Sequence, residues 1–377
     1  MTGQSAMDYW ESVLGARHIV LGKSHEALLE DYLALSTIFQ RHGARVNAHS
    51  PTARIPAELL QHTFRLLRDI VERERSETTE DMHDSKADYK NGRPRPPIWS
   101  VVTRVCSRWR MIAHDDRFLW QDIRILPIEP WVKHMLKLAK FSKIHVRARL
   151  PDVKKTGHIL YALLCGRDGY ANSHRISSLD ISTDDGHYAT KALYECTRLP
   201  SLERVTIRLD DEPGPYGTTR RELHWERFLA RAPKLRSISV SGYTLNGGGP
   251  RQPCTSLTRL SLSGGEKHRQ LGLGPQMKAE SLLRSLECMP ALQELVLDDI
   301  VPLPAEAQAA LLLRKKLSIQ VAHVTFRHRD LPASLPFISV LSSLAIQLTL
   351  HTDRADESTL STLLNHAPLK LPDPGFL

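Results

Sequence analysis

The sequence has no apolar segment long enough to cross a membrane. Its longest apolar runs, such as AALLLR at residues 309–314, are far shorter than the roughly 20 residues that a membrane-spanning helix needs. The N-terminus lacks a basic stretch followed by an apolar one, which disfavours a secretory signal peptide, and its acidic residues disfavour a transit peptide. We therefore expect a protein of the cytoplasm or nucleus with no membrane partner.

Paired cysteines and the usual catalytic motifs are missing as well. The five cysteines form no C-x-x-C pair, and their odd number disfavours a disulfide framework, so we expect most of them to be small buried residues. The 18 histidines include no H-E-x-x-H pair, which disfavours a zinc site. No G-x-S-x-G sequence is present either, so we expect no metal and no hydrolase nucleophile.

Three glycine-containing segments match phosphate-binding sequences only in part. VLGKS at residues 20–24 ends like a P-loop, but Arg17 stands where the first glycine should be. NGGGP at 246–250 lacks the spacing of a dinucleotide site, and LSGGE at 262–266 has no accompanying Walker motif. The sequence therefore predicts no catalytic residues, no cofactor and no enzyme activity.

The chain carries a net charge of +9, yet its basic residues are not concentrated. No run of five like charges occurs, and a solvated surface explains this distribution better than a nucleic-acid site does. A nucleic-acid-binding protein would gather Lys and Arg on one face together with stacking aromatic side chains. That class stays a remote alternative, and we expect no nucleic-acid partner.

The length of 377 residues exceeds one ordinary core, so we expect more than one structural unit. The first is a helical segment over residues 1–50, whose first 23 residues show no clear pattern. From Ser24, a plausible N-cap, apolar residues recur at steps of three and four as far as Phe39. This spacing predicts a helix from Ser24 to about Gly43.

Residues 51–125 form a second expected unit, in which a polar insertion separates two apolar helices. Pro56 fits the first turn of a helix, where its missing N–H has no intrahelical partner. The residues that follow it and share one apolar face are Leu59, Leu60, Phe64, Leu67 and Val71. Residues 72–97 contain no Leu, Ile, Val, Phe or Trp, which predicts a flexible surface insertion.

A second helix of this unit is predicted just after the insertion. Its apolar stripe consists of Val102, Val105, Cys106, Trp109, Ile112 and Ala113. Asp115 and Asp116 are expected to end it, and Phe118, Leu119 and Trp120 form another apolar cluster.

Beyond residue 130 a six-residue apolar motif of the form L-x-x-L-x-L recurs at intervals of about 20 to 35 residues. Its copies are FSKIHV at 141, ISSLDI at 176, LERVTI at 202, LRSISV at 235, LTRLSL at 257, LQELVL at 292, VAHVTF at 321 and LSSLAI at 341. Such self-similarity is typical of leucine-rich repeats, in which each motif supplies one strand of a curved parallel sheet. Segments with helical apolar stripes lie between the motifs, at 187–199, 220–232, 278–289 and 356–367.

With both halves in view, the chain resembles fungal F-box proteins that carry a C-terminal domain similar to leucine-rich repeats. The resemblance rests on IPAELL at 55–60, Phe64, VCSRWR at 105–110 and LW at 119–120, which match the F-box pattern in order and chemistry. The insertion at 72–97 departs from that family, which joins the two halves by a short segment. The Asn or Cys that usually follows each repeat strand is also absent, so the resemblance implies an irregular solenoid.

The resemblance implies a non-catalytic substrate-recognition subunit of an SCF-type ubiquitin ligase. Its F-box would bind a Skp-type adaptor, which connects to cullin and RING subunits. The positions that match the F-box pattern are the implied adaptor-binding residues: Ile55, Pro56, Leu59, Leu60, Phe64, Val105, Cys106, Trp109, Leu119 and Trp120. The alternative is an interaction scaffold that binds the adaptor or another partner without directing ubiquitination.

The repeat domain would select an unknown protein substrate. Solenoids usually bind partners through the concave surface of the sheet, at the variable positions of the strand motifs. The candidate substrate-binding residues at such positions are Glu203, Arg204, Arg208, Arg236, Arg259 and Glu294. The expected architecture is thus a small all-helical domain over 51–125, followed by a β/α solenoid over 130–377 with a curved parallel sheet and outer helices.

Overall fold

The structure, a computed structural model, divides the chain into two compact units. One contains residues 1–75 and 97–115, and the other contains residues 76–96 and 116–377. The residues that the structure describes are 3–21, 24–77, 89–90, 93–94, 96–126, 128–150, 153–166, 172–183, 186–209, 222–223, 226–242, 244–245, 253–264, 282, 285–300, 321–327 and 345–351. No helix among these described residues is long and apolar enough to span a membrane.

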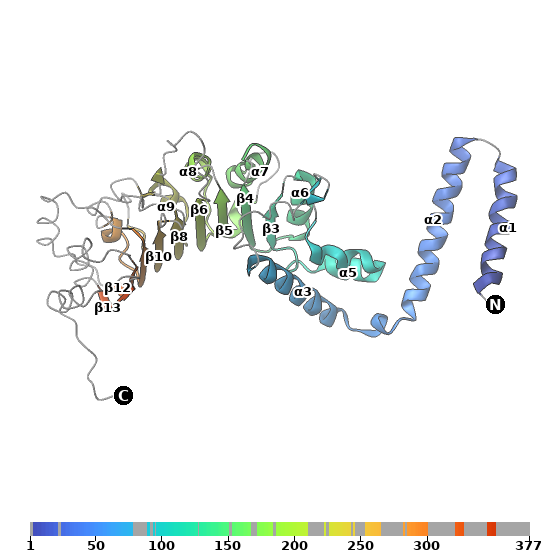
Figure 1. Ribbon diagram of the computed structural model, residues 1–377, viewed down its shortest axis with the longest axis horizontal. Helices are drawn as coiled ribbons and strands as arrows, with labels where there is room; N and C mark the ends of the chain where they lie inside the picture. Colours follow the sequence, from blue (N-terminus) through green and yellow to red (C-terminus); the bar gives the residue numbers. More distant parts are fainter. Residues whose placement is uncertain are drawn as a thin grey trace, which may run out of the picture. The chain divides into compact units, whose positions relative to one another are not determined.

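Two long helices, α1 (Gly3–Leu21) and α2 (His25–Ala48), begin the first unit (Figure 1). The expected N-cap of α2 is confirmed, because the Ser24 side chain accepts a hydrogen bond from the backbone N–H of Ala27. The expected end near Gly43 is wrong: a single glycine inside a helix costs only about 1 kcal/mol, and α2 continues to Ala48. α1 lies within the expected helical segment 1–50, although residues 1–23 show no clear helical pattern in the sequence.

The same unit continues with η1 (Pro51–Arg54), α3 (Ala57–Glu77), η4 (Ile98–Val101), α4 (Val102–Val105) and α5 (Ser107–Asp115). Pro56 directly precedes α3, and its carbonyl accepts the first hydrogen bond of the helix, from Leu60. The helix expected after the insertion is in fact two helices, because Cys106 between them has the extended angles φ −157° and ψ 169°.

The expected polar insertion at 72–97 is only partly described. Its first residues belong to α3, which runs to Glu77 because Glu and Arg are good helix formers. The next described residues form a short antiparallel pair, β1 (Tyr89–Lys90) and β2 (Arg93–Pro94). The flexibility predicted for the remainder falls on residues that lie outside the described part of the chain.

The second unit is built on a nine-stranded parallel sheet in the order β13-β12-β11-β10-β8-β6-β5-β4-β3. Its strands are β3 (Asp122–Ile125), β4 (Ile144–Leu150), β5 (Ile176–Thr183), β6 (Arg204–Leu209), β8 (Ser237–Ser241), β10 (Arg259–Ser263), β11 (Glu294–Asp298), β12 (Val321–Arg327) and β13 (Ala345–His351). Two short strands, β7 (Glu222–Leu223) and β9 (Thr244–Leu245), pair only with each other. Each strand of the large sheet thus lies beside the next one in the chain, which confirms the expected parallel α/β arrangement.

The helices of this unit are α6 (Glu129–Leu138), α7 (Val153–Cys165), α8 (Gly186–Glu195) and α9 (Glu226–Arg231), with a short η5 (Ser173–Arg175). Figure 1 shows them along one side of the sheet, where α6 contacts β3, α7 contacts β3 and β4, and α8 contacts β5. α8 overlaps the predicted helical segment 187–199 and α9 lies within 220–232, whereas α6 and α7 were not anticipated. Of the remaining two segments, 278–289 is helical at residue 282 and at 285–287, and 356–367 lies outside the described residues.

Burial alternates along the strands, with apolar side chains beneath the helices and polar ones on the other face. In β6, for example, Val205, Ile207 and Leu209 are buried, and the residues between them are not. The strand register aligns Ile207 with Ile181 of β5 and Val240 of β8. The core is therefore a layer between the helices and one face of the sheet, and the opposite face, the open face, stays polar.

Six of the eight predicted strand motifs, those beginning at 176, 202, 235, 257, 292 and 321, align with one another in the observed register. The first and last motifs are out of register. In β4, Val146 rather than Ile144 aligns with Leu179 of β5, and in β13 the aligned sequence is AIQLTL at 345–350. Each of these two segments contains additional apolar residues, so more than one six-residue window satisfies the L-x-x-L-x-L pattern.

A ninth motif precedes those that the sequence indicated. WQDIRI at residues 120–125 has the same apolar spacing, and Ile123 and Ile125 align with Val146 and Ala148 of β4. Trp120 takes the first position of this motif and is 1% exposed. The sheet therefore begins before residue 130, inside the region that the sequence assigned to the preceding helical domain.

The alternating burial predicts how two neighbouring residues of β6 differ in their contribution to stability. Ile207→Ala should lower the free energy of unfolding of the sheet unit by about 3 kcal/mol, because it leaves a cavity in a packed core. Thr206→Ala, on the open face, should change it by about 1 kcal/mol or less. Chemical denaturation followed by circular dichroism measures both, and equal effects would contradict the assignment of the two faces.

Candidate binding surfaces

Helix α3 carries two apolar faces side by side. One includes Leu60 and Phe64, which are 3% and 1% exposed, and it faces the interior of the helical unit. The other includes Leu59, Leu66 and Ile70, which are 57%, 49% and 53% exposed and lie on one side of the helix because they are seven and four residues apart. A helix that has an exposed stripe of large apolar side chains next to its buried stripe is typical of a partner-binding helix.

The two halves of the F-box-like sequence are in direct contact within the helical unit. The rings of Phe64 on α3 and Trp109 on α5 lie 5.1 Å apart at an angle of 52°. The guanidinium of Arg108 donates hydrogen bonds to the backbone carbonyls of Thr52 (3.1 Å) and Ile55 (2.6 Å). Arg108 therefore connects α5 to the chain segment that leads into α3.

Cys106 helps to start α5. Its Sγ accepts a hydrogen bond from the backbone N–H of Trp109 at 3.4 Å, so the thiol acts as an N-cap for a helix N–H that would otherwise lack a partner. The side chain is half-buried, and of the five cysteines only Cys196 is fully buried. The expectation that most cysteines are buried is therefore wrong, although all five are free thiols.

The ten implied adaptor-binding residues fall into three groups. Leu59, Val105 and Pro56 are exposed, with Val105 54% exposed. Ile55, Cys106 and Trp109 are half-buried, and Leu60 and Phe64 are buried between the helices. Leu119 and Trp120 are buried in the other unit, where the Trp120 ring packs against Trp131 and His134 of α6.

Several exposed apolar residues of the helical unit were missed by the sequence reading. They are Leu66 and Ile70 on α3, Ile98 and Val101 on η4, and Met111 on α5. Ile98 and Met111 are the most exposed, at 70% and 67%. For Leu66 and Ile70, the signal in the sequence is the width of the apolar surface of α3. One apolar stripe is enough to pack a helix against its own unit, so a second stripe beside it indicates a partner.

The open face of the sheet is the second candidate surface. The row at the beginning of the strands aligns Asp122, His145, Ser178, Arg204, Ser237, Arg259, Glu294, His323 and Gln347. Neighbouring strands lie about 4.8 Å apart, so this row forms a continuous polar track across the sheet.

Arginines are concentrated on the first four strands of the open face. Arg124, Arg147, Arg149, Arg204 and Arg208 lie on β3 to β6, where the acidic residues are Asp122 and Asp180. The first three were missed, because β3 was not anticipated and the β4 motif was placed out of register. The surface therefore has more positive charge at its N-terminal strands than the sequence pattern suggested.

The six candidate substrate-binding residues lie on or beside this open face. Arg204, Arg208, Arg259 and Glu294 belong to strands, and Glu203 and Arg236 directly precede β6 and β8. Arg208 pairs with Asp180 at 3.7 Å, and Arg259 pairs with Glu294 at 3.2 Å. These cross-strand ion pairs leave a surface of mixed charge that favours specific polar contacts.

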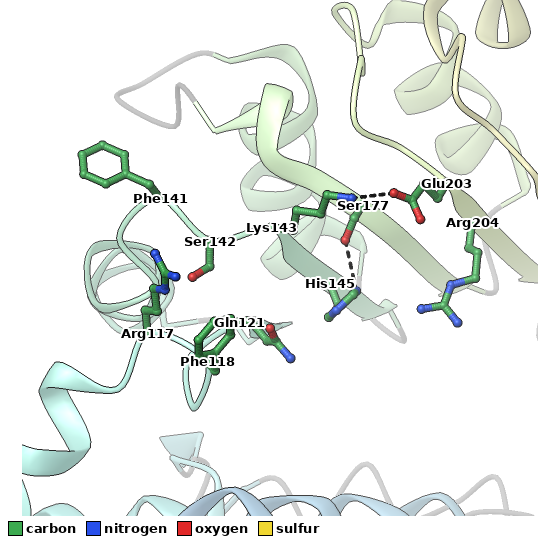
Figure 2. A pocket seen from close by; sticks show the side chains of 10 residues that line it. All are labelled: Arg117, Phe118, Gln121, Phe141, Ser142, Lys143, His145, Ser177, Glu203 and Arg204. Atoms are coloured by element: carbon green, nitrogen blue, oxygen red, sulfur yellow. Dashed lines mark hydrogen bonds and ion pairs between the residues drawn. The ribbon is translucent and has the colours of Figure 1, made fainter. Parts of the chain in front are cut away.

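Glu203 and Arg204 also line a pocket of about 410 Å³ (Figure 2). The pocket lies where β3 to β6 begin, and its other lining residues are Arg117, Phe118, Gln121, Phe141, Ser142, Lys143, His145 and Ser177. The Lys143 ammonium donates to the Glu203 carboxylate at 2.6 Å, and the Ser177 hydroxyl lies 3.3 Å from Nδ1 of His145. Polar groups from β4, β5 and β6, and from the segments just before β3, β4 and β6, therefore line one volume.

The hydrogen bond from Lys143 lowers the pKa of Glu203. The charges of Lys143, Arg236 and Arg204 add to this effect, and partial burial opposes it. Glu203 is thus held as a carboxylate by the cations around it. No group of three or more His, Cys, Asp or Glu side chains in the described part of the chain is arranged to hold a metal ion.

Comparisons with known proteins do not identify the chain. No model of a known protein family matches it, and no curated protein matches it. The two surfaces are therefore interpreted from their own chemistry.

The lowered pKa predicts a titration that depends on Lys143. The midpoint for the Glu203 carboxyl should lie below the ordinary glutamate value and should rise in Lys143→Met, as carbon-13 NMR can measure. Because the folded pKa is the lower one, stability from this pair is present above the unfolded pKa and is lost as pH falls through the folded pKa. Lys133→Met, which removes the partner of Glu129, is the matched control, and equal shifts in both variants would contradict the assignment.

Proposed function

We propose that this protein is a substrate-recognition subunit of an SCF-type ubiquitin ligase. The helical unit binds a Skp-type adaptor, and the open face of the sheet binds a protein substrate. In this role the small helical unit is an F-box domain and the sheet unit is an irregular solenoid of leucine-rich-repeat type. In this role the chain acts as a receptor rather than as an enzyme.

The observation that carries the proposal is the set of exposed large apolar side chains on the helices that match the F-box pattern. The set consists of Leu59, Leu66 and Ile70 on α3 and of Ile98, Val101, Val105 and Met111 on the segments that follow the insertion. Burying such side chains against a partner is favourable by about 1.5–3 kcal/mol for each fully buried residue. We define this set of seven residues as the adaptor surface.

The buried matches to the F-box pattern have a different role in this proposal. Leu60 and Phe64 are buried and hold the helical unit together, and the Phe64 ring contacts the Trp109 ring of α5. Trp120 begins the first strand motif of the sheet unit, and Leu119 directly precedes it. We therefore assign adaptor binding to the exposed Leu59 and Val105 and assign the four buried residues to packing.

The sheet unit supports the receptor role because its open face is polar on β3 to β10 and has apolar residues, such as Val296 and Ala345, only from β11 onward. Helices cover the other face where they are described, so the open face is the broad surface available to a partner (Figure 1). A scaffold that binds the adaptor without directing ubiquitination would use the same two surfaces. Turnover of a bound partner that depends on the proteasome would favour the receptor over the scaffold.

The adaptor surface predicts the effect of a double substitution. Leu59→Asp with Val105→Asp should weaken binding to a purified Skp-type adaptor by about 100-fold or more, because apolar residues at the centre of an interface each contribute about 2 kcal/mol. Both residues are exposed, so circular dichroism and the unfolding transition should stay unchanged. Isothermal titration calorimetry measures the affinity.

The matched control is Leu29→Asp with Val46→Asp, which places the same changes on α2 at residues that are 50% and 58% exposed. This control should bind the adaptor as the unaltered protein does. The proposal fails if the unaltered protein does not bind the adaptor, or if the two double variants bind with equal affinity.

A further inference from the structure

Helices α1 and α2 expose many large apolar side chains to water. None of the 24 residues of α2 is buried, although helices in proteins are stable chiefly because other parts of the structure cover an apolar face. A surface of this composition indicates that the two helices bind a partner. Their large apolar residues that are 36% exposed or more are Met7, Tyr9, Trp10, Leu14, Leu28, Leu29, Tyr32, Leu33, Ile38, Phe39 and Val46.

The two helices form an antiparallel hairpin (Figure 1). The centre of the Trp10 ring lies 6.4 Å from that of the Phe39 ring, and Arg17 forms an ion pair with Asp31. Leu35, four residues after Asp31 and therefore on the same side of α2, is half-buried. α1 thus covers one side of α2 and leaves the neighbouring side in water.

An exposed stripe with regular spacing runs along this neighbouring side of α2. Its large residues are between 50% and 67% exposed and are Leu29, Tyr32, Phe39 and Val46. The small residues Ser36 and Gly43 lie between them, so the six follow one another at steps of three and four. An average step of 3.5 residues is that of the seam along which α-helices pair. We define these six residues as the α2 seam, which is about 26 Å long.

Gly43 is the seam residue that α2 alone does not explain. Glycine is the least favourable residue in a helix interior after proline. A Cβ at this position would meet nothing within 4 Å in the described part of the chain, its own helical backbone aside, so alanine would fit and would strengthen the helix. Glycine is needed where another chain segment approaches closely. Gly43 therefore indicates that a second helix packs against the seam.

The α2 seam is complementary to an antiparallel copy of itself. Two-fold symmetry about the centre of the seam brings each aromatic ring against a small residue and repeats every pairing. A parallel pair would instead place each ring against the same ring and the glycine against the glycine, which fills space poorly. The opposed pairs are Tyr32 with Gly43 of the partner subunit, Phe39 with Ser36 of the partner subunit, and Leu29 with Val46 of the partner subunit.

The charges of α2 favour the same orientation. The acidic residues Glu26, Glu30 and Asp31 lie in the first half of the helix. Arg41 and Arg45 lie in the second half. Antiparallel pairing places the acidic half of each copy along the basic half of the other, whereas parallel pairing would bring like charges together.

The exposed area is large enough for a dimer. With about 200 Å² for each large apolar side chain, the residues in and beside the seam expose on the order of 900 Å² per chain. A stable complex buries about 800 Å² on each partner. These residues are the four large ones of the seam, their neighbours Leu28 and Leu33, and Met7, Trp10 and Leu14 of α1, which follow one another by about one turn.

A lipid surface fits these helices less well than a second copy does. Helices that lie on membranes carry mainly Lys and Arg on their polar face, whereas α2 has three acidic residues and two arginines. A flat lipid surface would also leave the glycine of the seam without a role.

We propose that two copies of this chain form a symmetric dimer through a four-helix bundle of α1 and α2, in which the two α2 seams pack antiparallel. The inference does not rest on the proposed function. For the proposed receptor, a dimer offers two open faces to one substrate, which raises the avidity for a substrate with two binding segments.

Sedimentation equilibrium of the full-length chain tests the proposal. The unaltered protein should approach twice the mass of one chain as its concentration rises. Gly43→Leu should weaken dimerisation about 100-fold or more, because the new side chain occupies the space of Tyr32 of the partner subunit at two symmetric places. Ala44→Leu is the matched control: it introduces the same side chain at the next position, which is exposed and turned away from the seam, and it should dimerise as the unaltered protein does.

An exchange of sizes tests the antiparallel pairing itself. Gly43→Leu combined with Tyr32→Ala should dimerise to within about tenfold of the unaltered protein, because the large and the small residue have changed places. Gly43→Leu combined with Phe39→Ala should stay monomeric, since Phe39 lies opposite a different residue of the partner subunit. Equal masses for these two double variants would overturn the pairing.

Three results would overturn the dimer. The first is an unaltered chain that stays monomeric up to its solubility limit. The second is a Gly43→Leu chain that dimerises as tightly as Ala44→Leu. The third is a monomeric chain that binds phosphatidylserine vesicles and loses this binding in Leu29→Asp with Val46→Asp, which would assign the seam to a lipid surface.

The aspartate variants separate this inference from the proposed function. Leu29→Asp with Val46→Asp should be monomeric and should bind the adaptor with unchanged affinity per chain. Leu59→Asp with Val105→Asp should remain dimeric. A dimer that binds no adaptor would remove the proposed function and keep this inference, and a monomer that binds the adaptor would do the reverse.

Discussion

The structure of the larger unit depends on the burial of one face of each strand beneath the helices. Apolar residues at alternating positions, such as Leu260 and Leu262 in β10, enter the core, and their period of two fixes which residues face away from it. A shift of one residue would bury Arg259 and expose both leucines. This constraint sets the register of neighbouring strands and leaves a polar face available for binding.

The sequence predicted this sheet well where the apolar spacing was unambiguous. Six motifs were placed in register because each has a single window of apolar residues bounded by polar ones. The motif at 141 was misplaced, since Phe141, Ile144, Val146 and Ala148 offer two windows, and only pairing with β5 selects one. β3 was missed because its WQDIRI motif overlaps the end of the F-box-like pattern.

The candidate sites were predicted less completely than the fold. Sequence matching indicated Leu59 and Val105, which are exposed, together with Leu60 and Phe64, which are buried, because exposure depends on how α3 and α5 pack. It indicated Glu203 and Arg204 as binding residues but not Ser142 or Arg117, which the loops before β3 and β4 bring to the same pocket. Residues far apart in the chain become neighbours only through the sheet register.

In the proposed function, one unit binds the adaptor and the other remains available to a substrate. Hydrogen exchange of the full chain, with and without a purified Skp-type adaptor, tests this division of roles. Exchange over residues 57–77 and 98–115 should be slower in the complex, and exchange over the strands from β4 to β12 should be unchanged. Protection of those strands by the adaptor, or no protection of either helical segment, would contradict it.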